Sequence, residues 1–540
     1  MLQISKLSKS FGAETVLREI SFVVNRGDRI ALIGPNGSGK STLLKIITGE
    51  LKPDDGVVAV ASEAAVGYLP QGQPIDDDRT VREIILGGVP GWSDARREME
   101  RLSERLGGED ADIDSLLFKY GYAQRSFEQL GGYPREHEAE RIAVGLGLPA
   151  ATLDRPASTL SGGQRARAGL ARLLITGPDL MLLDEPTNHL DITALEWLES
   201  TLAEFPGGIL LVSHDRVFLD RIANKVIALD PETGTAREYT GNYSEFAAVL
   251  AREIEKTRQA WHDQQAEIRR MEADIHQTRM HAKSVELTTT SGQPTVRRYA
   301  KKVARKALSR EKKLERYLDS DERVEKPEAG WRMKLAFDRS MRSGQQVLTI
   351  DSLSFAYPGA APVLHKLDLE LSYGDRTALV GDNGSGKSTL LKLIAGDLAP
   401  AAGRVALGSA VRIGYMPQEQ EALSPERSAL EVVQSARPMS ETDARNFLHY
   451  FLFEGDAALL PAGRLSYGER ARLLLAKLVV EGANFLVLDE PVNHLDIPSR
   501  ERFEAALDAF PGTVLAAVHD RAFIRNFGRR VIRMEDGKLL

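Results

Sequence analysis

The sequence contains no cysteine among its 540 residues, which excludes structural disulfides and cysteine-ligated zinc sites. It also lacks long apolar runs. Segments such as Leu-Met-Leu-Leu at 180–183 have the length of a strand and fall far short of the roughly 20 residues that a membrane-spanning helix needs. The N-terminus, MLQISKLSKSFG, has no apolar stretch of the secretory kind. We therefore expect a cytoplasmic protein that does not span a membrane by itself.

The chain repeats itself, and the repeats define its organisation. The length and the 42% hydrophobic composition suit two or three packed domains. The first two of the motifs given below recur 347 residues later in the chain, and the last two recur 305 residues later. The first copy therefore carries 42 extra residues, which lie within 72–159. The repeated segments are GPNGSGKSTLLK (34–45) and GDNGSGKSTLLK (381–392), GYLPQ (67–71) and GYMPQ (414–418), LSGGQRAR (160–167) and LSYGERAR (465–472), and LDEPTNHLDI (183–192) and LDEPVNHLDI (488–497).

A segment of another kind lies between the copies. Apolar residues recur at helical spacing over 246–283 and again over 296–318, with the polar stretch TTTSGQPT at 288–295 between them. Two amphipathic helices joined by a polar tip predict an antiparallel hairpin or coiled coil, and Pro327 is expected to end the return helix. We therefore expect three domains, at 1–245, 246–330 and 331–540, with a helical insertion within 72–159.

Each copy contains a phosphate-binding loop pattern, G-x4-G-K-S, that follows a strand-like run and precedes a helix-like run. Glycines allow the backbone to turn tightly and to aim its N–H groups at phosphate oxygens, while the lysine reaches the outer phosphates and the serine binds magnesium. The pattern predicts ATP and Mg²⁺ as ligands. The candidate residues are Gly34, Asn36, Gly37, Gly39, Lys40, Ser41 and Thr42, and Gly381, Asn383, Gly384, Gly386, Lys387, Ser388 and Thr389.

Acid pairs follow buried-strand patterns in both copies. Asp184 and Asp489 are expected at the ends of strands, where they bind magnesium, and the next residues, Glu185 and Glu490, are candidates for activating the attacking water. Further candidates are the histidines at strand ends, the glutamines of the metal shell, and aromatic residues for stacking on adenine, although early-strand aromatics are more often part of a core. These are His214 and His519, Gln71 and Gln418, and Phe11 and Tyr357.

With these motifs the sequence resembles the ATP-binding-cassette (ABC) superfamily, whose signature motif matches LSGGQ and LSYGE. The resemblance implies an α/β fold: two P-loop ABC-type ATPase domains with helical subdomains, joined here by an antiparallel two-helix linker. It also implies a head-to-tail pair of cassettes, in which the P-loop of one copy meets the signature of the other. Ser466, Gly468 and Glu469 would then complete the Lys40 site, and Ser161, Gly163 and Gln164 the Lys387 site.

The tandem order, the GNYSEF element at 241–246 and the NHLD elements resemble the ABC-F subfamily. That resemblance implies a monomer that binds the ribosome and moves its linker toward the peptidyl-tRNA, either as a translation factor or as a protein that dislodges ribosome-targeting antibiotics. Two departures in the second copy, Tyr467 for Gly162 and Val492 for Thr187, leave open whether both sites hydrolyse ATP equally.

The charge distribution independently favours an RNA partner for the linker. Residues 251–320 contain 17 Lys or Arg against 10 Asp or Glu, whereas the formal charge of the whole chain is −7. A basic segment on an acidic protein is typical of contact with a phosphate backbone, although most charge runs are solvated helix faces. The candidate RNA-facing residues, with the ribosomal RNA and peptidyl-tRNA as partners, are Arg297, Arg298, Tyr299, Lys301, Lys302, Arg305 and Lys306.

Other functions for a paired-cassette ATPase stay open at this level. The chain could be the motor of a membrane transporter whose membrane subunits are separate chains, or a DNA-associated ABC ATPase. Repair-type members usually carry zinc-binding cysteines, and chromosome-type members have far longer coiled coils inserted inside one cassette. A nucleotide-dependent clamp that scarcely turns over is a further alternative, against which the intact Glu185 and Glu490 argue.

Overall fold

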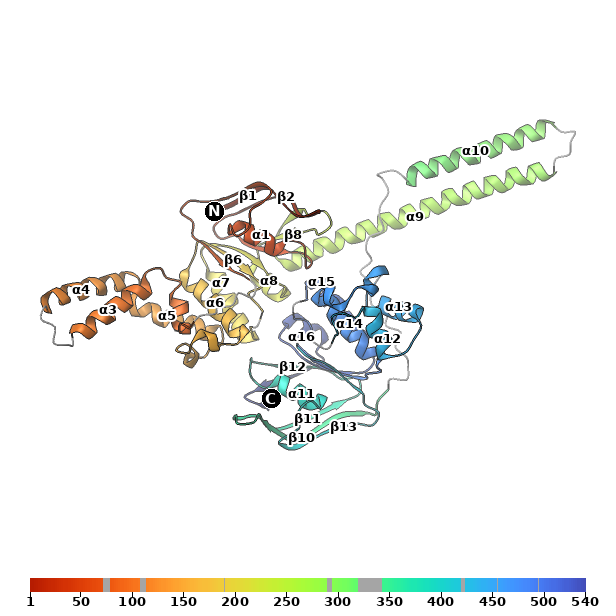
Figure 1. Ribbon diagram of the computed structural model, residues 1–540. Helices are drawn as coiled ribbons and strands as arrows, with labels where there is room; N and C mark the ends of the chain where they lie inside the picture. The colour runs from red at the N-terminus through yellow and green to blue at the C-terminus, as the bar shows by residue number, and fades with distance from the viewer. Residues whose placement is uncertain are drawn as a thin grey trace. The chain divides into compact units, whose positions relative to one another are not determined.

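The computed structural model describes residues 1–70, 78–106, 113–188, 190–288, 294–318, 342–418, 423–453, 455–493 and 495–540 (Figure 1). It divides into two compact units. The first comprises Met1–Tyr243 together with Arg332–Leu540, and the second is Ser244–Trp331. The first unit contains two copies of one α/β fold, termed cassette 1 and cassette 2 below. Within the described residues, no helix is long and apolar enough to cross a membrane.

Cassette 1 is built on a six-stranded sheet in the order β5-β6-β7-β3-β8-β9. All neighbouring strands pair in parallel except β8 and β9. The central strands are continuous apolar runs because helices and a second sheet cover their faces. The strands are β3 (Arg29–Ile33), β5 (Val66–Leu69), β6 (Leu180–Asp184), β7 (Gly208–Val212), β8 (Lys225–Leu229) and β9 (Ala236–Thr240).

A second, three-stranded antiparallel sheet has the order β2-β1-β4. This sheet and the helix α1 (Lys40–Ile47) both pack against the six-stranded sheet. Its strands are β1 (Leu2–Phe11), β2 (Glu14–Val24) and β4 (Asp55–Val60). One buried cluster joins the two sheets and α1, and it contains Leu7, Leu43 and Leu182 at 0% exposure. The phosphate-binding loop is therefore anchored at both ends, because the strand before it, β3, and the helix after it, α1, both belong to this buried cluster.

Cassette 2 repeats this architecture with the sheet orders β14-β15-β16-β12-β17-β18 and β11-β10-β13. The six-stranded sheet contains β12 (Arg376–Gly381), β14 (Ile413–Met416), β15 (Phe485–Asp489), β16 (Thr513–Ala517), β17 (Arg530–Glu535) and β18 (Lys538–Leu539). The antiparallel sheet contains β10 (Gln346–Ala356), β11 (Pro362–Ser372) and β13 (Ala402–Leu407), and the P-loop helix is α11 (Lys387–Ala395). The predicted fold of two P-loop ABC-type domains is confirmed.

Each cassette adds a helical layer. In cassette 1 it contains α2 (Val81–Leu86), α3 (Trp92–Leu106), α4 (Ile113–Gln129), α5 (Gly132–Gly145), α6 (Gly162–Thr176), and the short helices η1 (Ala150–Thr152) and η2 (Ala157–Thr159). In the described part of cassette 2 it contains α12 (Ala429–Ala436), α13 (Glu441–Tyr450), η4 (Gly455–Leu459), η5 (Ala462–Arg464) and α14 (Tyr467–Val480). The extra residues of the first copy thus form helices, with buried Trp92 on α3 packed against Phe127 on α4.

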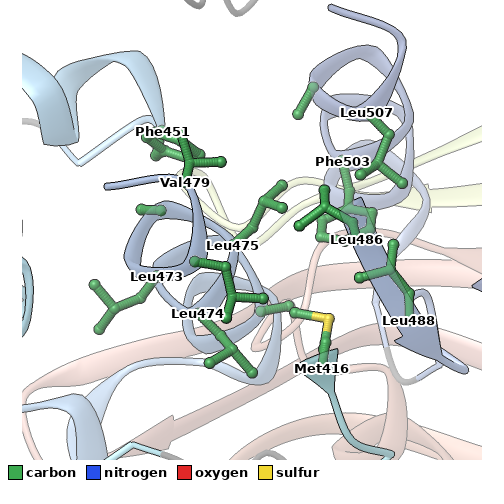
Figure 2. Close-up of a cluster of buried hydrophobic side chains, with 14 of the residues drawn as sticks. Met416, Phe451, Leu473, Leu474, Leu475, Val479, Leu486, Leu488, Phe503 and Leu507 are labelled. Atoms are coloured by element: carbon green, nitrogen blue, oxygen red, sulfur yellow. The ribbon is translucent and has the colours of Figure 1, made fainter. Parts of the chain in front are cut away.

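The helical layer of cassette 2 is joined to its sheet by a dense apolar cluster. Figure 2 shows side chains of α14, such as Leu474, gathered with Leu486 of β15 and Phe503 of α15 (Ile497–Ala509). Helix α7 (Ile192–Glu204) is the counterpart of α15 in cassette 1, and α8 (Arg216–Ile222) and α16 (Arg521–Phe527) follow the next strand of each copy. This packing connects α14 to β15, the strand that bears the acid pair.

The second unit is a pair of helices, α9 (Tyr243–Thr288), most of which belongs to this unit, and α10 (Pro294–Leu318). They pack around Ile268, Ile275 and Leu314. Arg310 pairs with Asp274 at 2.7 Å and Arg279 with Glu311 at 3.0 Å. Gln264 of α9 lies next to Tyr317 of α10 (3.5 Å), so positions early on α9 face late positions on α10 and the helices are antiparallel.

The helical stripe expected from the sequence is only partly buried. Ile268 and Ile275 are buried, whereas Leu250 and Ile254, which lie before the stretch of α9 that faces the described residues of α10, are 38% and 40% exposed. Pro327, predicted to end the return helix, lies outside the described residues.

Candidate nucleotide-binding and hydrolysis site

The P-loop of each cassette joins the carboxyl end of a central strand to the start of a helix. Gly39 and Gly386 precede α1 and α11 with φ angles of 91° and 104°, in the left-handed region that glycine adopts without strain. A Cβ at Gly39 would lie 2.8 Å from the Leu17 side chain, so the loop also needs glycine for close packing. The backbone N–H groups at these helix starts form a binding place for anionic phosphate.

The P-loop lysines are buried and fold back on their own loops. Lys40 Nζ donates to the carbonyl oxygens of Gly34 and Pro35 at 2.8 and 2.9 Å. Lys387 makes the same two contacts in cassette 2, at the same distances, with Gly381 and Asp382. Burial lowers the pKa of both ammonium groups, and the neighbouring carboxylates oppose that shift. Each lysine is therefore a preorganised cation that phosphate oxygens can attract away from carbonyl partners.

The acid pairs lie where their strands end. Asp184 is the last residue of β6 and Asp489 the last of β15, and the P-loop serine next to each, Ser41 or Ser388, acts to lower the pKa of that aspartate. Burial raises the pKa of both aspartates. The Asp489 Oδ1 atom is buried without a hydrogen-bond partner among the described residues. A hydroxyl beside a buried carboxylate with a free oxygen is a donor set that Mg²⁺ accepts.

The glutamates that follow adopt an unusual backbone conformation. Glu185 and Glu490 have φ angles of 54° and 48°, a left-handed region that costs a non-glycine residue free energy and that clusters at functional sites. Their N–H groups donate to the carbonyls of Val212 and Ala517 on the adjacent strand, both at 2.9 Å, which holds the turn. In both copies the charge of the P-loop lysine, Lys40 or Lys387, acts on the glutamate carboxyl and works to lower its pKa.

The electrostatics of these glutamates follow from burial. Burial raises the pKa of Glu185 to about 8, although the charge of Arg500 opposes it. Burial, with the charge of Asp489, also raises the pKa of Glu490. A carboxylate with a raised pKa is a stronger base than a solvated one, so both residues are suited to taking a proton from water.

Histidine lies against the glutamate in both copies. His214 Nε2 is 3.1 Å from Glu185 Oε1, and His519 Nε2 is 3.5 Å from Glu490 Oε1. Burial and the charge of Lys387 lower the pKa of His519 to about 4, so it is neutral at physiological pH. Gln418 Nε2 also donates to Glu490 Oε2 at 3.0 Å, while Gln71, its counterpart in cassette 1, lies outside the described residues.

The signature motifs form helix starts. Ser161 caps α6 and Ser466 caps α14, and in each the serine and the residue three positions on, Gln164 or Glu469, bond reciprocally. A Cβ built on Gly468 would lie 3.1 Å from Ser499 Oγ, so the second signature packs against the start of α15. These caps fix small residues at a positive helix end, which suits contact with phosphate.

A cavity of about 490 Å³ brings the first signature to the candidate catalytic residues of cassette 2. Cassette 1 contributes Ser161 and Gly163, and cassette 2 contributes Gln418, Glu490 and His519. We term this arrangement, with Lys387 and Asp489, site B. Site A is the equivalent set of Lys40, Asp184, Glu185 and His214 with the second signature, Ser466 to Glu469.

Two aspartates that the motif analysis did not select connect the cassettes. Asp191 caps α7 through Ala194 N and accepts from Asn383 N of the opposite P-loop at 3.4 Å. Asp496 caps α15 and accepts from Asn36 N at 2.9 Å. The repeated NHLD segment was visible in the sequence, but an N-cap role alone explains an aspartate before a helix. Only the structure shows the second bond of each carboxylate.

Exchanged ion pairs also join the cassettes, and sequence reasoning missed them. Arg216 at the start of α8 pairs with Glu504 of α15, and Arg521 at the start of α16 pairs with Glu199 of α7. The residues of the two pairs correspond across the repeats, because 216 and 521, like 199 and 504, differ by 305. Both pairs lie among residues that are largely buried, and Arg216 also reaches Glu501 at 3.3 Å.

The two copies differ next to their candidate catalytic residues. In cassette 1 the Thr187 and Ser213 hydroxyls bond at 2.9 Å, which links the acid-pair loop to the histidine loop. The equivalent residues of cassette 2 are Val492 and Val518, both buried. The hydrogen-bonded pair of hydroxyls in cassette 1 is therefore replaced by a pair of apolar side chains in cassette 2.

The aromatic candidates for adenine stacking are exposed and not part of a core. Phe11 is 52% exposed, with Lys9 Nζ 5.7 Å from its ring centroid. Tyr357 is 39% exposed, and its hydroxyl lies 3.3 Å from Thr389 Oγ1 beside the P-loop. Tyr357 is thus placed next to the phosphate-binding element, and the roles of both rings stay predictions.

The linker candidates are described in part. Lys302, Arg305 and Lys306 lie on α10 with exposed side chains. The side chains of Arg297, Arg298, Tyr299 and Lys301 lie outside the described part of the chain.

The comparisons with known proteins agree with this geometry. A family model described as ABC transporter matches residues 17–188 and 364–493, and a second one with the same description matches 229–337. The chain is 38% identical over its full length to the putative ATP-binding protein YdiF of Bacillus subtilis, covering 80% of that protein. It is 35% identical to ABC transporter F family member 5 of Arabidopsis thaliana, over 100% of this chain and 75% of that one.

Identity is 34% to the energy-dependent translational throttle protein EttA of Mycobacterium tuberculosis, over 96% of this chain and 89% of the relative. Among solved structures, one described as RNase-L Inhibitor superposes with a TM-score of 0.60 at 18% identity, over 99% of this chain and 90% of that one, which supports the fold. With its two P-loops, its two signatures and these relatives, the chain is an ATPase and belongs to the ABC-F subfamily of ATP-binding-cassette proteins.

Proposed function

We propose that this chain is a ribosome-associated ATPase that uses ATP-driven closure of its two cassettes to place its helical linker near the peptidyl-tRNA and the peptidyl-transferase region. It acts on translation, either as a translation factor or as an antibiotic-resistance protein that protects the ribosome. The proposal rests on a basic helix pair that lies between the two cassettes in the sequence, and on the first signature, which lines one cavity with Gln418, Glu490 and His519 of cassette 2.

In each site the chain's own residues divide the work of hydrolysis. The P-loop N–H groups and Lys40 or Lys387 hold the outer phosphates and offset charge that develops on them. Glu185 or Glu490 takes the proton from the attacking water, whose oxygen forms the new bond to the γ-phosphorus. The bond from that phosphorus to the bridging oxygen breaks, and ADP leaves with phosphate. His214 and His519 contact the glutamates and hold them toward the phosphate.

The residues present fit a magnesium ion in each site. Ser41 with Asp184, and Ser388 with Asp489, offer hard oxygen donors, and the free Asp489 Oδ1 is an acceptor that lacks any other partner in the described structure. Gln418, which donates to the neighbouring Glu490, is a further candidate for that metal shell. When bound, magnesium would neutralise charge on the phosphates.

Closure follows from the division of each site between cassettes. A nucleotide held by the P-loop of one cassette presents its γ-phosphate to the signature serine and helix start of the other, so ATP favours the closed pair and phosphate release favours opening. The bonds from Asp191 and Asp496 to the opposite P-loops make each loop sensitive to the position of the other cassette.

The charge of the linker supports the ribosome as the partner. Helix α10 carries ten Lys or Arg and two Asp or Glu, in a protein whose overall formal charge is −7. Lys302, Arg305 and Lys306 are exposed, and a cluster of exposed cations favours a phosphate backbone. A relative that covers almost the whole chain is named a translational throttle protein, which supports the same partner.

The experiment uses the full chain with Glu185→Gln and Glu490→Gln, which we expect to retain ATP without hydrolysing it. Co-sedimentation with ribosomes should require ATP. Normal ATP turnover by this double variant would refute the assignment of the bases. Absence of ribosome binding, in a protein shown to hold ATP, would refute the ribosome proposal and leave a membrane or DNA partner to be sought.

The linker is tested in the same background by Lys302→Glu, Arg305→Glu and Lys306→Glu together. We expect ribosome binding to weaken while ATP binding is unchanged. The matched control reverses three exposed basic residues on cassette 2, namely Lys366, Arg404 and Lys538. An equal loss of ribosome binding in both triple variants would show that net charge, and not the linker, is responsible.

A further inference from the structure

Tyr467 is the clearest departure between the two signature motifs, and its hydroxyl has a defined partner. It is the first residue of α14, where the first copy has Gly162. The Tyr467 hydroxyl donates to the backbone oxygen of Gln418 at 3.0 Å. A Cβ built on Gly162 meets nothing within 4 Å, so the first signature has room for a side chain but none to make such a bond.

The bond joins elements that serve different nucleotide sites. Tyr467 belongs to the signature that completes site A. Gln418 follows β14, and its Nε2 atom donates to Glu490 Oε2, the candidate base of site B, at 3.0 Å. Asn493 Nδ2 donates to the same Glu490 oxygen. A continuous series of hydrogen bonds therefore runs from the signature helix of one site to the base of the other.

Further contacts hold Tyr467 at the start of α14. Ser466 and Glu469 form a capping box around the start of α14, and the Arg470 guanidinium lies 5.5 Å from the Tyr467 ring centroid. The Tyr467 ring also packs against the apolar cluster of Figure 2. The residue directly before Gln418 is Pro417, whose ring fixes its own φ angle. A movement of the first turn of α14 therefore reaches the Gln418 backbone through the Tyr467 hydroxyl.

We propose that Tyr467 is a positioning residue that couples the two ATP sites in one direction, from the engagement of nucleotide by the second signature in site A to the placement of Glu490 in site B. The first signature has no side chain at the equivalent position, so Gly162 cannot make the reverse coupling through this contact. The inference rests on the assignment of Glu490 as the base of site B, proposed above.

The test compares single-turnover ATP hydrolysis by rapid quench in two backgrounds of the full chain. Glu185→Gln leaves site B as the hydrolytic site, and Glu490→Gln leaves site A. A lost hydrogen bond of ordinary strength corresponds to a change of about 2- to 10-fold, so Tyr467→Phe should slow site B by that factor. Site A should slow by a smaller factor than site B. Tyr467→Gly, which copies the first signature, should match Tyr467→Phe at site B.

Tyr450→Phe, an exposed tyrosine at the end of α13, is the control and should leave both rates unchanged. Equal slowing of both sites by Tyr467→Phe, or no slowing of site B, overturns the inference. Turnover by the Glu185→Gln, Glu490→Gln double variant would instead refute the assignment of the bases, so the two failures are distinct.

A second measurement does not depend on turnover. With ATP bound to that double variant, amide hydrogen exchange across 485–493 should accelerate by about threefold or more when Tyr467→Phe is added, because Gln418 no longer holds the loop. Tyr450→Phe should not change it. Unchanged exchange with Tyr467→Phe would overturn the inference.

Discussion

The exchanged ion pairs allow a test of how the cassettes engage. Arg216 pairs with Glu504, and the two side chains are only 15% and 11% exposed. Loss of one partner of a buried ion pair costs about 3–5 kcal/mol. The cost is smaller here because Glu504 still accepts a hydrogen bond from the Asn526 amide and because both positions are partly open to water. We therefore expect the free energy of cassette closure to become less favourable by about 2 kcal/mol. That corresponds to an increase of roughly 30-fold in the ATP concentration for half-maximal closure in Arg216→Glu.

The assay uses the absence of cysteine in the chain. Cysteines introduced at the exposed positions Lys52 and Lys366 carry a donor and an acceptor dye, and energy transfer reports closure during ATP titration of the Glu185→Gln, Glu490→Gln background. Glu504→Arg should weaken closure to a similar extent. The double exchange, Arg216→Glu with Glu504→Arg, should recover most of the wild-type response because it restores opposite charges at the same contact.

The control is an exposed ion pair between an arginine and a carboxylate. Arg404 lies 3.1 Å from Asp351, and these side chains are 72% and 55% exposed, so Arg404→Glu should shift the titration by less than about threefold. A shift in Arg216→Glu no larger than in this control would refute the reasoning. So would a double exchange that is as impaired as the single variants.

Single side chains allow three more tests. The pKa of His519 is lowered to about 4 in the folded protein, whereas an unfolded histidine titrates near 6.5. The unfolded state therefore binds more protons than the folded state between these two pH values. The free energy of unfolding should fall as the pH drops through this range, by about 3 kcal/mol in all. Urea unfolding at a series of pH values should show this slope in the wild type and a flatter one in His519→Gln. Phe503→Ala removes a ring with 0% exposure and should lower the unfolding free energy of cassette 2 by about 3–5 kcal/mol, measured by urea denaturation, whereas an unchanged midpoint would contradict the packing. Tyr357→Ala should raise the Kd for ATP about 2- to 10-fold if the ring stacks on adenine, with Tyr357→Phe near the wild type; equal affinities in all three would assign the ring no such role.

The local patterns of the sequence determined most of the fold. The runs RIALI and LMLLD form buried parallel strands because uninterrupted apolar segments must be covered on both faces. The glycines of the P-loop indicated a turn that only they tolerate, and the Ser-x-x-Gln and Ser-x-x-Glu spacings at 161 and 466 form capping boxes. The repeated motifs established which residues of the two copies correspond. The change in their offset from 347 to 305 located the inserted helices.

What the tertiary structure alone decided concerns residues far apart in the chain. A sequence does not reveal that Arg216 meets Glu504, or that Asp496 accepts a bond from Asn36, because charge and capping patterns have many equivalent solutions on a surface. The positive φ of Glu490 likewise follows from the strand that holds its N–H, and not from its identity. The linker stripe shows the limit of periodicity, because a helical pattern predicts which face is apolar, while the packing against other residues decides how much of that face is covered.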